Sequence, residues 1–175
     1  MKTAAWKVLL ALSMISVLML GSTAPVEARP LAGFSYFGKH YYKVVHTSTS
    51  LSSWTSVKQS AGVDYALIIN KKHYEGHLVT ITSERENAFV QGLIQQGHAP
   101  AWIGASQAAG GANSGDGWGW VTDEAWIYAN WAAGQPDDGA GAETCLIMNT
   151  DGTWSDALWN QIGVVTFIVE CELVR

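Results

Sequence analysis

The stretch between Gln135 and Asp156 constrains this chain most, because it concentrates acids, amides and glycines without a single Lys or Arg. Carboxylates that converge with no cationic side chain repel one another, so they need either open water or a bound cation. The stretch therefore predicts a loop that folds around solvent or around an ion. The oxygen-bearing residues available in it are Gln135, Asp137, Asp138, Glu143, Asn149, Asp151 and Asp156.

The first 28 residues have the pattern of a secretory signal peptide. Lys2 and Lys7 give a basic start, residues 8–20 are an apolar run, and residues 26–28 offer a small-residue cleavage site ending at Ala28. The run is shorter than the roughly 20 residues that cross a bilayer, so we expect no membrane span. The pattern predicts a secreted or periplasmic protein, cleaved after Ala28.

The rest of the chain has the length of one domain, expected over residues 40–175 behind a short N-terminal leader over residues 29–39. The full chain carries a formal charge of -5. An acidic surface disfavours nucleic acid and anionic membranes as partners, because both are themselves negatively charged.

Two cysteines, Cys145 and Cys171, form at most one internal disulfide, which is too few to hold together a fold that lacks a core. Their pairing stays open, because the sequence does not show whether the two backbones approach each other closely enough. Seven of the nine tryptophans lie between Trp102 and Trp159. Tryptophan buries a large apolar area, so most of them are expected in the core.

The first half of the domain predicts strands and helices in alternation. Residues 40–45 are β-branched and aromatic and predict a strand, whereas the Ser- and Thr-rich residues 47–60 predict a loop pinned to the body by Trp54. Residues 64–74 predict a helix, because a group of apolar residues is followed by two lysines, and basic residues are favoured in the last turn of a helix. Residues 78–81 then predict a short buried strand.

A capping box at Ser83 and Glu86 predicts the start of a second helix. Its buried face is expected to contain Phe89, Val90, Leu93 and Ile94. The second half of the domain predicts short strands over 101–104, 118–120, 144–148, 153–154 and 164–169, with an exposed glycine-rich loop over 108–117. Two early helices followed by several short strands are typical of an α+β fold.

At this level of detail the chain resembles the C-type lectin-like domain from about residue 40 to residue 172. The matching pieces, in the family's order, are residues 76–81, Trp102-Ile103-Gly104, Asn130-Trp131, Gln135-Pro136-Asp137, Glu143-Thr144-Cys145, Trp154-Ser155-Asp156 and residues 167–170. The resemblance implies a compact loop whose two ends meet in a small antiparallel sheet. Two helices flank the small antiparallel sheets, and a second, long loop carries the binding site.

The resemblance also implies a single Ca2+ site, with oxygen ligands of the kind that Ca2+ prefers. The implied ligands are Gln135, Asp137, Glu143, Ser155 and Asp156, and the same residues would bind the sugar while two vicinal sugar hydroxyls coordinate the ion. Pro136 is implied to follow a cis peptide bond. Ser155 departs from the family, since calcium-binding members usually carry Asn at that position, and loss of one ligand costs about 1 to 3 kcal/mol.

In animal lectins that resemble this chain, Gln-Pro-Asp goes with galactose-type sugars and Glu-Pro-Asn with mannose-type sugars. The implied function is therefore an exported, calcium-dependent lectin that favours galactose-type over mannose-type carbohydrate. The main alternative is a lectin-like domain that binds a protein partner, with calcium structural or absent. A glycoside-acting enzyme with Asp137 and Glu143 as its carboxylate pair is less favoured, because acids held by a cation do not readily cycle protons. No enzymatic activity is expected.

Other features of the sequence have simpler interpretations. Trp118, Trp126 and Trp131 are candidates for stacking on a sugar, although core packing is the favoured role of each. Asp151 is expected in a turn with a solvated acid. His73 and His77 lie four residues apart, but the intervening acid is misplaced for a zinc-protease motif, so surface or packing histidines are expected.

The cysteines depart from the family as well. Cys145 matches one member of a family disulfide, and Trp159 stands at the partner's position. The other family pair is absent, with Val169 at its final position and Cys171 two residues later. The resemblance therefore leaves the pairing of Cys145 with Cys171 open.

Overall fold

The computed structural model describes residues 31–47, 53–95, 99–108, 113–139 and 141–174. The expected signal peptide over 1–28, with its cleavage site after Ala28, lies outside these ranges. Within them, neither helix has the length and apolar character that crossing a bilayer requires.

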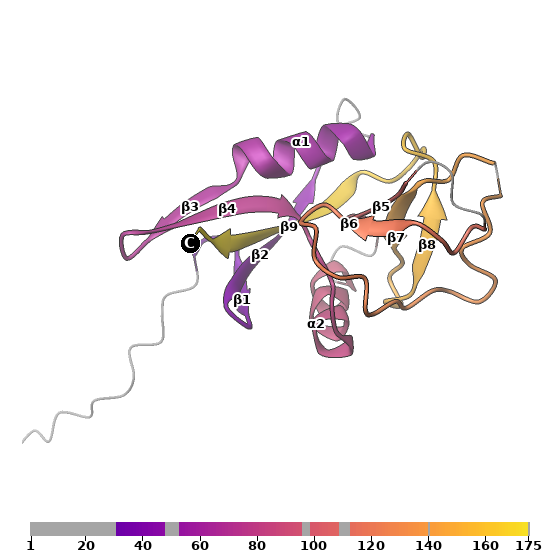
Figure 1. The fold of residues 1–175 in the computed structure, drawn as a ribbon. Helices are drawn as coiled ribbons and strands as arrows, with labels where there is room; N and C mark the ends of the chain where they lie inside the picture. The colour runs from indigo at the N-terminus through magenta and orange to yellow at the C-terminus, as the bar shows by residue number, and fades with distance from the viewer. Residues whose placement is uncertain (1–30, 48–52, 96–98, 109–112, 140, 175) are drawn as a thin grey trace, which may run out of the picture.

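The strands form one mixed sheet in which the two ends of the domain meet. Strand β9 (Thr166–Leu173) pairs antiparallel with β2 (His40–His46), and β2 pairs in turn with β1 (Ser35–Phe37). The range expected as a leader therefore contributes a strand to the sheet. This meeting of early and late strands confirms the closed arrangement that the family resemblance implies (Figure 1).

Strand β9 also joins the two halves of the sheet. On one side it pairs antiparallel with β4 (Lys72–Leu78), and at Trp102 and Phe167 it makes a parallel contact with β5 (Ala101–Gln107). The mixed sheet thus includes one parallel pair beside the antiparallel ones. Beyond β5 lie β6 (Trp118–Trp120), β7 (Cys145–Met148) and β8 (Trp154–Ala157).

The expected loop over residues 47–60 is wrong, because helix α1 (Trp54–Asp64) begins inside it. The hydroxyl of Ser53 caps the helix by accepting a hydrogen bond from the amide of Ser56 at 3.2 Å. The buried residues of α1 are Trp54, Val57 and Ala61, which recur at helical spacing. The surrounding serines and threonines conceal this short apolar stripe in the sequence.

Trp54 pins this segment to the body as expected, although from a helix and not from a loop. Its indole nitrogen donates to the backbone carbonyl of Ile103 at 2.9 Å, and the side chain is buried. The contact fixes the start of α1 against the middle of β5.

The expected helix over residues 64–74 is also wrong, because strands β3 (Ala66–Ile69) and β4 form a hairpin there. Asn70 and Lys71 occupy the two-residue turn with φ angles of 52° and 65°, as in the turns that match the twist of a hairpin. Gly76 lies in β4, where a Cβ would come within 2.5 Å of the Ala61 carbonyl. A glycine at this position therefore lets α1 pack closely on the strand.

Helix α2 (Glu84–Gln95) is confirmed where the capping box predicts it. The hydroxyl of Ser83 accepts from the amide of Glu86 at 3.3 Å. The carboxylate of Glu86 accepts from the amide of Thr82 at 2.9 Å, one residue before the position expected for a capping box. Helices α1 and α2 lie on opposite sides of the strands (Figure 1), so the α+β fold is confirmed.

Trp154 lies at the centre of the core and is fully buried. Its indole nitrogen donates to the side-chain oxygen of Asn87 on α2 at 2.8 Å. Four aromatic rings surround it with centroid distances of 5.6 to 6.3 Å, those of Trp120, Trp126, Tyr128 and Trp131. The tryptophan-rich half of the chain therefore supplies a large part of the core, as expected.

Cys145 and Cys171 are both buried and are free thiols. Burial raises the pKa of the Cys145 thiol to about 11 and that of the Cys171 thiol to about 12. Both therefore remain protonated and unreactive near neutral pH. Packing, and not a disulfide, holds the described part of the fold together.

Candidate functional site

The stretch that the sequence singled out forms a loop at the end of the molecule opposite to the C-terminus (Figure 1). It leaves the core after Trp131, which forms a bridge with Trp154, and it returns as β7 and β8. The peptide bond between Gln135 and Pro136 is cis, the conformation that the family resemblance implies. Asp156 stands on β8, so a rigid strand presents one acid to a loop that carries the others.

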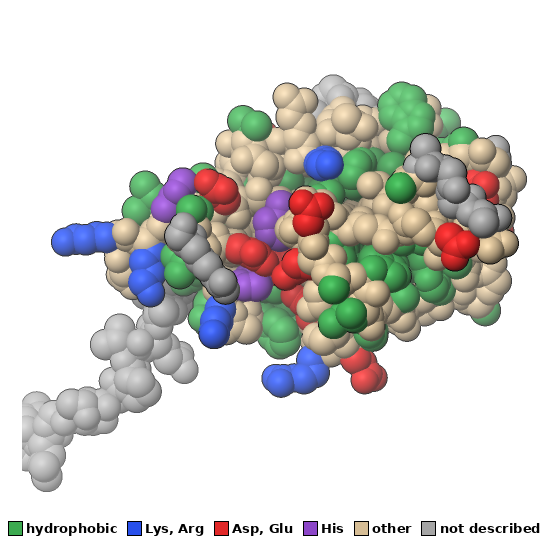
Figure 2. Space-filling model, in the orientation of Figure 1, with side chains coloured by type: hydrophobic (Ala, Val, Ile, Leu, Met, Phe, Trp, Pro, Cys, Tyr) green, Lys and Arg blue, Asp and Glu red, His purple; other side chains and the backbone are tan. Residues whose placement is uncertain are grey.

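Three carboxylates converge in this loop. Asp137, Glu143 and Asp156 each offer an oxygen, and these oxygens all lie within 4.8 Å of one another. Asp137 is exposed, Glu143 is half-buried and Asp156 is buried, with 5% of its surface accessible. Figure 2 shows acidic side chains gathered at this end of the molecule.

No basic side chain neutralises these acids in the part of the chain that the structure describes. The ion pairs found there all involve His40 or His77, at a different place in the fold. Like charges at such short distances disfavour one another in the absence of a counter-charge. The cluster is therefore a candidate site for a cation.

Backbone amides hold the carboxylates in place. Asp156 accepts from the amides of Asp137 at 3.2 Å and Asp138 at 2.8 Å. The amide of Gly139 donates to Glu143 at 2.7 Å, and it also donates to Asp137 at 3.2 Å. These bonds hold the carboxylates in position and organise the loop around them.

The amide of Gln135 also faces the cluster. Its side-chain oxygen accepts a hydrogen bond from the backbone amide of Asp156 at 3.1 Å. The Gln135 side chain thus lies against the backbone of Asp156, and its amide oxygen is an uncharged donor of the kind that Ca2+ accepts. The structure thus brings together four of the five predicted ligands: Gln135, Asp137, Glu143 and Asp156.

Ser155 makes a different contact. Its hydroxyl accepts a hydrogen bond from the side-chain amide of Asn149 at 3.0 Å, and the same amide donates to Thr153 at 3.2 Å. Ser155 directly precedes Asp156 in β8, but its hydroxyl is engaged by Asn149 and not by the acid cluster. The contact between Asn149 and Ser155 depends on the register of β7 against β8, so residue types alone do not predict it.

Two acids of the stretch have structural roles. Asp138 accepts from the backbone amide of Glu143 at 3.0 Å and so closes the loop. Asp151 accepts from the amide of Thr153 at 2.9 Å, in a turn, as predicted. Hydrogen bonds from Thr153 lower the pKa of the Asp151 carboxyl, so this acid is already satisfied.

The tryptophans considered for sugar stacking pack against one another. Trp118 lies 5.2 Å from Trp131 and 6.3 Å from Trp126, measured between ring centroids. Trp118 is buried, and the other two are half-buried against the same core. Core packing is therefore their role, as favoured from the sequence.

The pKa of the Glu143 carboxyl is raised. Burial is the largest cause, and it is partly offset by the hydrogen bond from the amide of Gly139. The negative charges of Asp156, Asp137 and Asp138 raise it further. These surroundings disfavour the ionised form of Glu143, whereas a bound cation would favour it.

Calcium affinity is expected to fall as the pH is lowered through the raised pKa of Glu143, because proton and ion compete for one carboxylate. The stability of the calcium-free fold changes with pH in the opposite direction. Above the raised pKa the ionised Glu143 lowers the free energy of unfolding, and this loss disappears as the pH falls through that pKa. The check is the calcium-induced shift in Tm between about pH 7 and about pH 5. A shift that stays constant over this window would show that Glu143 does not bind the ion.

The fold and this oxygen-rich loop define a lectin-like binding domain. The model of the Lectin C-type domain family matches residues 71–162, more than half of the chain. The chain therefore belongs to the C-type lectin domain family. Asialoglycoprotein receptor 1 from Rattus norvegicus is 32% identical over 134 residues, which are 73% of this chain and 39% of the receptor. Perlucin from Haliotis laevigata is 34% identical over 91 residues, which are 51% of this chain and 55% of perlucin.

Solved structures share the fold. The C-type lectin CEL-I from Cucumaria echinata superposes with a TM-score of 0.68 at 19% identity, covering 84% of this chain and all of CEL-I. A calcium-independent type II antifreeze protein superposes with a TM-score of 0.63 at 19% identity, covering 82% of this chain and 95% of that protein. Since identity is this low, these similarities show the fold alone.

The chain spans between a quarter and about half of the length of the curated relatives that it matches first. Its relatives are lectins and lectin-like proteins, which are binding proteins and not enzymes. This agrees with the expectation that the chain is not an enzyme.

Proposed function

We propose that this chain is an exported lectin that binds carbohydrate through a calcium ion held in the loop between Gln135 and Asp156. The observation that carries the proposal is the convergence of three carboxylates within 4.8 Å, with no basic side chain paired to them in the described ranges. Four oxygen-donating side chains in a loop with preformed hydrogen bonds suit a hard cation with flexible coordination. The ion would be held by Gln135, Asp137, Glu143 and Asp156, with Ser155 as the weakest candidate ligand.

Calcium gives such a site a way to bind sugar. An ion with six to eight oxygen ligands has coordination positions left over when about five come from protein, and two vicinal hydroxyls fill them. The side chain of Gln135 both donates and accepts hydrogen bonds, whereas the carboxylates only accept. The order Gln-Pro-Asp supports galactose-type rather than mannose-type ligands, on the resemblance described above.

Export is part of the same proposal. A basic start, a short apolar run and a cleavage site ending at Ala28 support secretion or delivery to the periplasm. Extracellular calcium modules work at about 10⁻⁴ to 10⁻³ M, a range in which a site weakened at Ser155 would still be occupied. The domain is proposed to extend from residue 40 to the C-terminal residues, with the preceding strand β1 attached to it.

The function is tested by chromatography on immobilised galactose and mannose at about millimolar calcium. Retention on galactose and release by a chelator are expected, with weaker retention on mannose. Magnesium in place of calcium serves as the control, because its smaller shell demands near-ideal octahedral geometry. Retention on galactose that a chelator leaves unchanged, with no thermal shift on adding calcium, would reject the metal-dependent function.

Replacing Ser155 with Asn is expected to strengthen calcium and galactose binding. An amide would reach further than the hydroxyl and add a ligand oxygen and a hydrogen-bond donor. A gain of about 1 to 2 kcal/mol corresponds to about five- to thirtyfold in affinity. Calorimetric titration with calcium measures the change.

The matched control is Ser155→Ala, which removes the hydroxyl without adding a ligand. It is expected to leave calcium affinity within about threefold of the natural chain, because the hydroxyl contacts Asn149. Equal affinities in Ser155→Asn and Ser155→Ala would place this position outside the site.

A further inference from the structure

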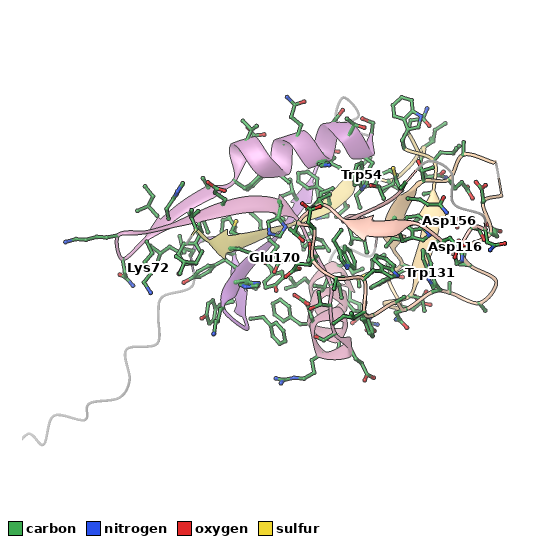
Figure 3. The ribbon with its side chains drawn as sticks, viewed as in Figure 1. Trp54, Lys72, Asp116, Trp131, Asp156 and Glu170 are labelled. Carbon is green, nitrogen blue, oxygen red and sulfur yellow. The ribbon has the colours of Figure 1, made fainter. Side chains whose placement is uncertain are left out.

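A second cluster of metal-binding side chains lies on the sheet, away from the loop. In the register of the sheet, Glu170 on β9 is opposite Tyr42 on β2 and His77 on β4. Residues two apart on a strand share a face, so His40 and Glu172 lie on the same face. Figure 3 shows Glu170 in the middle of the molecule and Asp156 at the loop end. The two clusters are therefore separate.

The side chains of this face lie close together. The Nδ1 atom of His40 lies 3.5 Å from Oε1 of Glu172, and it is hydrogen-bonded to Oε1 of Glu170 at 2.6 Å, a contact that would lengthen if both atoms bound one ion. The Nε2 atom of His77 lies 3.8 Å from the same Glu172 oxygen. Ligand atoms about 2.1 Å from a tetrahedral ion are separated by about 3.4 Å. Glu172 thus stands between two imidazoles at nearly the spacing of neighbouring ligands.

His77 carries the most specific sign of a metal. Its Nδ1 atom lies 2.9 Å from the carbonyl oxygen of Leu78, and since a carbonyl only accepts, Nδ1 is the protonated nitrogen. In the neutral ring Nε2 then has a free lone pair. This atom is buried, and no hydrogen-bond partner reaches it among the described residues. Metal-binding histidines typically hold their second nitrogen to a carbonyl in this way.

The surroundings also favour an ion. Glu170 is almost completely buried, with 1% of its surface exposed, and it accepts from Tyr42 at 2.9 Å and from the amide of Thr80 at 3.0 Å. These bonds fix the carboxylate on the same face as His40. Figure 2 shows acidic and histidine side chains gathered over the middle of this face.

We propose that His40, Glu170 and Glu172, whose ligand atoms lie within 4.8 Å of one another, form a site for a divalent transition metal, zinc first, with His77 joining it beside Glu172. Imidazole nitrogens combined with carboxylate oxygens suit Zn2+, whereas Ca2+ prefers oxygen ligands alone. The ion would join β2, β4 and β9, the strands in which the two ends of the domain meet. It would act as a clamp there, in a fold whose two cysteines are unpaired.

Zinc titration of the tag-free, chelator-treated chain in saturating calcium tests this site. One zinc ion per chain and a rise in Tm are expected. Replacing Glu172 with Ala is expected to weaken zinc binding by more than about tenfold, and His40→Ala by a similar factor. Both side chains are about a third exposed, so the variants are expected to fold, which the Tm of the metal-free proteins verifies. Co2+ in place of Zn2+ is expected to give the visible absorption of a tetrahedral site.

His73→Ala is the matched control, because His73 is exposed on β4, four residues before His77. It is expected to leave zinc binding unchanged, and so is Glu143→Ala in the loop. Absence of zinc binding, or equal affinity in the natural chain and Glu172→Ala, would overturn the proposal. Zinc binding that is lost in Glu143→Ala would overturn it too, since the ion would then lie in the loop. None of these outcomes depends on sugar binding.

Discussion

Replacing Glu143 with Ala is expected to abolish calcium binding and retention on galactose, with an affinity loss of more than about a hundredfold. The variant removes one of three converging carboxylates, and calcium affinity depends on the number of charged ligands. Calorimetry with calcium measures the loss. The calcium-free variant is expected to unfold at the same Tm or slightly higher, because burial and the neighbouring acids raise the pKa of Glu143 and so disfavour its ionised form in the folded chain.

Asp151→Asn is the control for this variant. It removes one negative charge from the same stretch, but Asp151 lies in the turn before β8, and an Asn oxygen still accepts from Thr153. Calcium affinity within about threefold of the natural chain is expected. If Glu143→Ala binds calcium as the natural chain does, the acid cluster is not the calcium site.

Replacing Trp154 with Ala is expected to lower the free energy of unfolding by about 3 to 5 kcal/mol. The change leaves a cavity among four aromatic rings and an unpaired buried oxygen on Asn87. Denaturant unfolding measures it. Calcium affinity is expected to fall as well, because Trp154 begins the strand that positions Asp156.

Trp159→Ala is the matched control, because it removes the same type of side chain from a position where 53% of the tryptophan surface is exposed. A loss of no more than about 1 kcal/mol is expected there. Equal losses in the two variants would contradict the central role of Trp154 in the core.

Helices and strands could be predicted where local chemistry determines them. The capping box at Ser83 marks α2 correctly, because its signal lies within four residues. In contrast, α1 has three buried apolar residues among polar ones, and its stability comes from packing on β4 and β5. The hairpin of β3 and β4 could not be predicted, because its turn residues Asn70 and Lys71 adopt positive φ angles and the turn lacks the glycine that usually marks it in a sequence.

In the candidate site too, some features could be predicted from local sequence and others depend on the tertiary structure. The convergence of acids in the loop could be predicted, because Asp137 and Glu143 lie close together in a stretch without basic residues. The backbone amides that hold them depend on loop geometry, which residue types do not reveal. The zinc candidate joins residues 130 positions apart, His40 and Glu170, so only the register of the sheet brings them together.

The most direct test of the central claim is a calorimetric titration of the natural chain with calcium, alone and in the presence of galactose or mannose. One calcium ion per chain in the loop is expected, because the acids form one cluster there. Galactose is expected to tighten calcium binding more than mannose does, since linkage makes each ligand strengthen the other by the same factor. No calcium binding at about millimolar concentration, or an affinity that neither sugar changes, would contradict a calcium-dependent lectin.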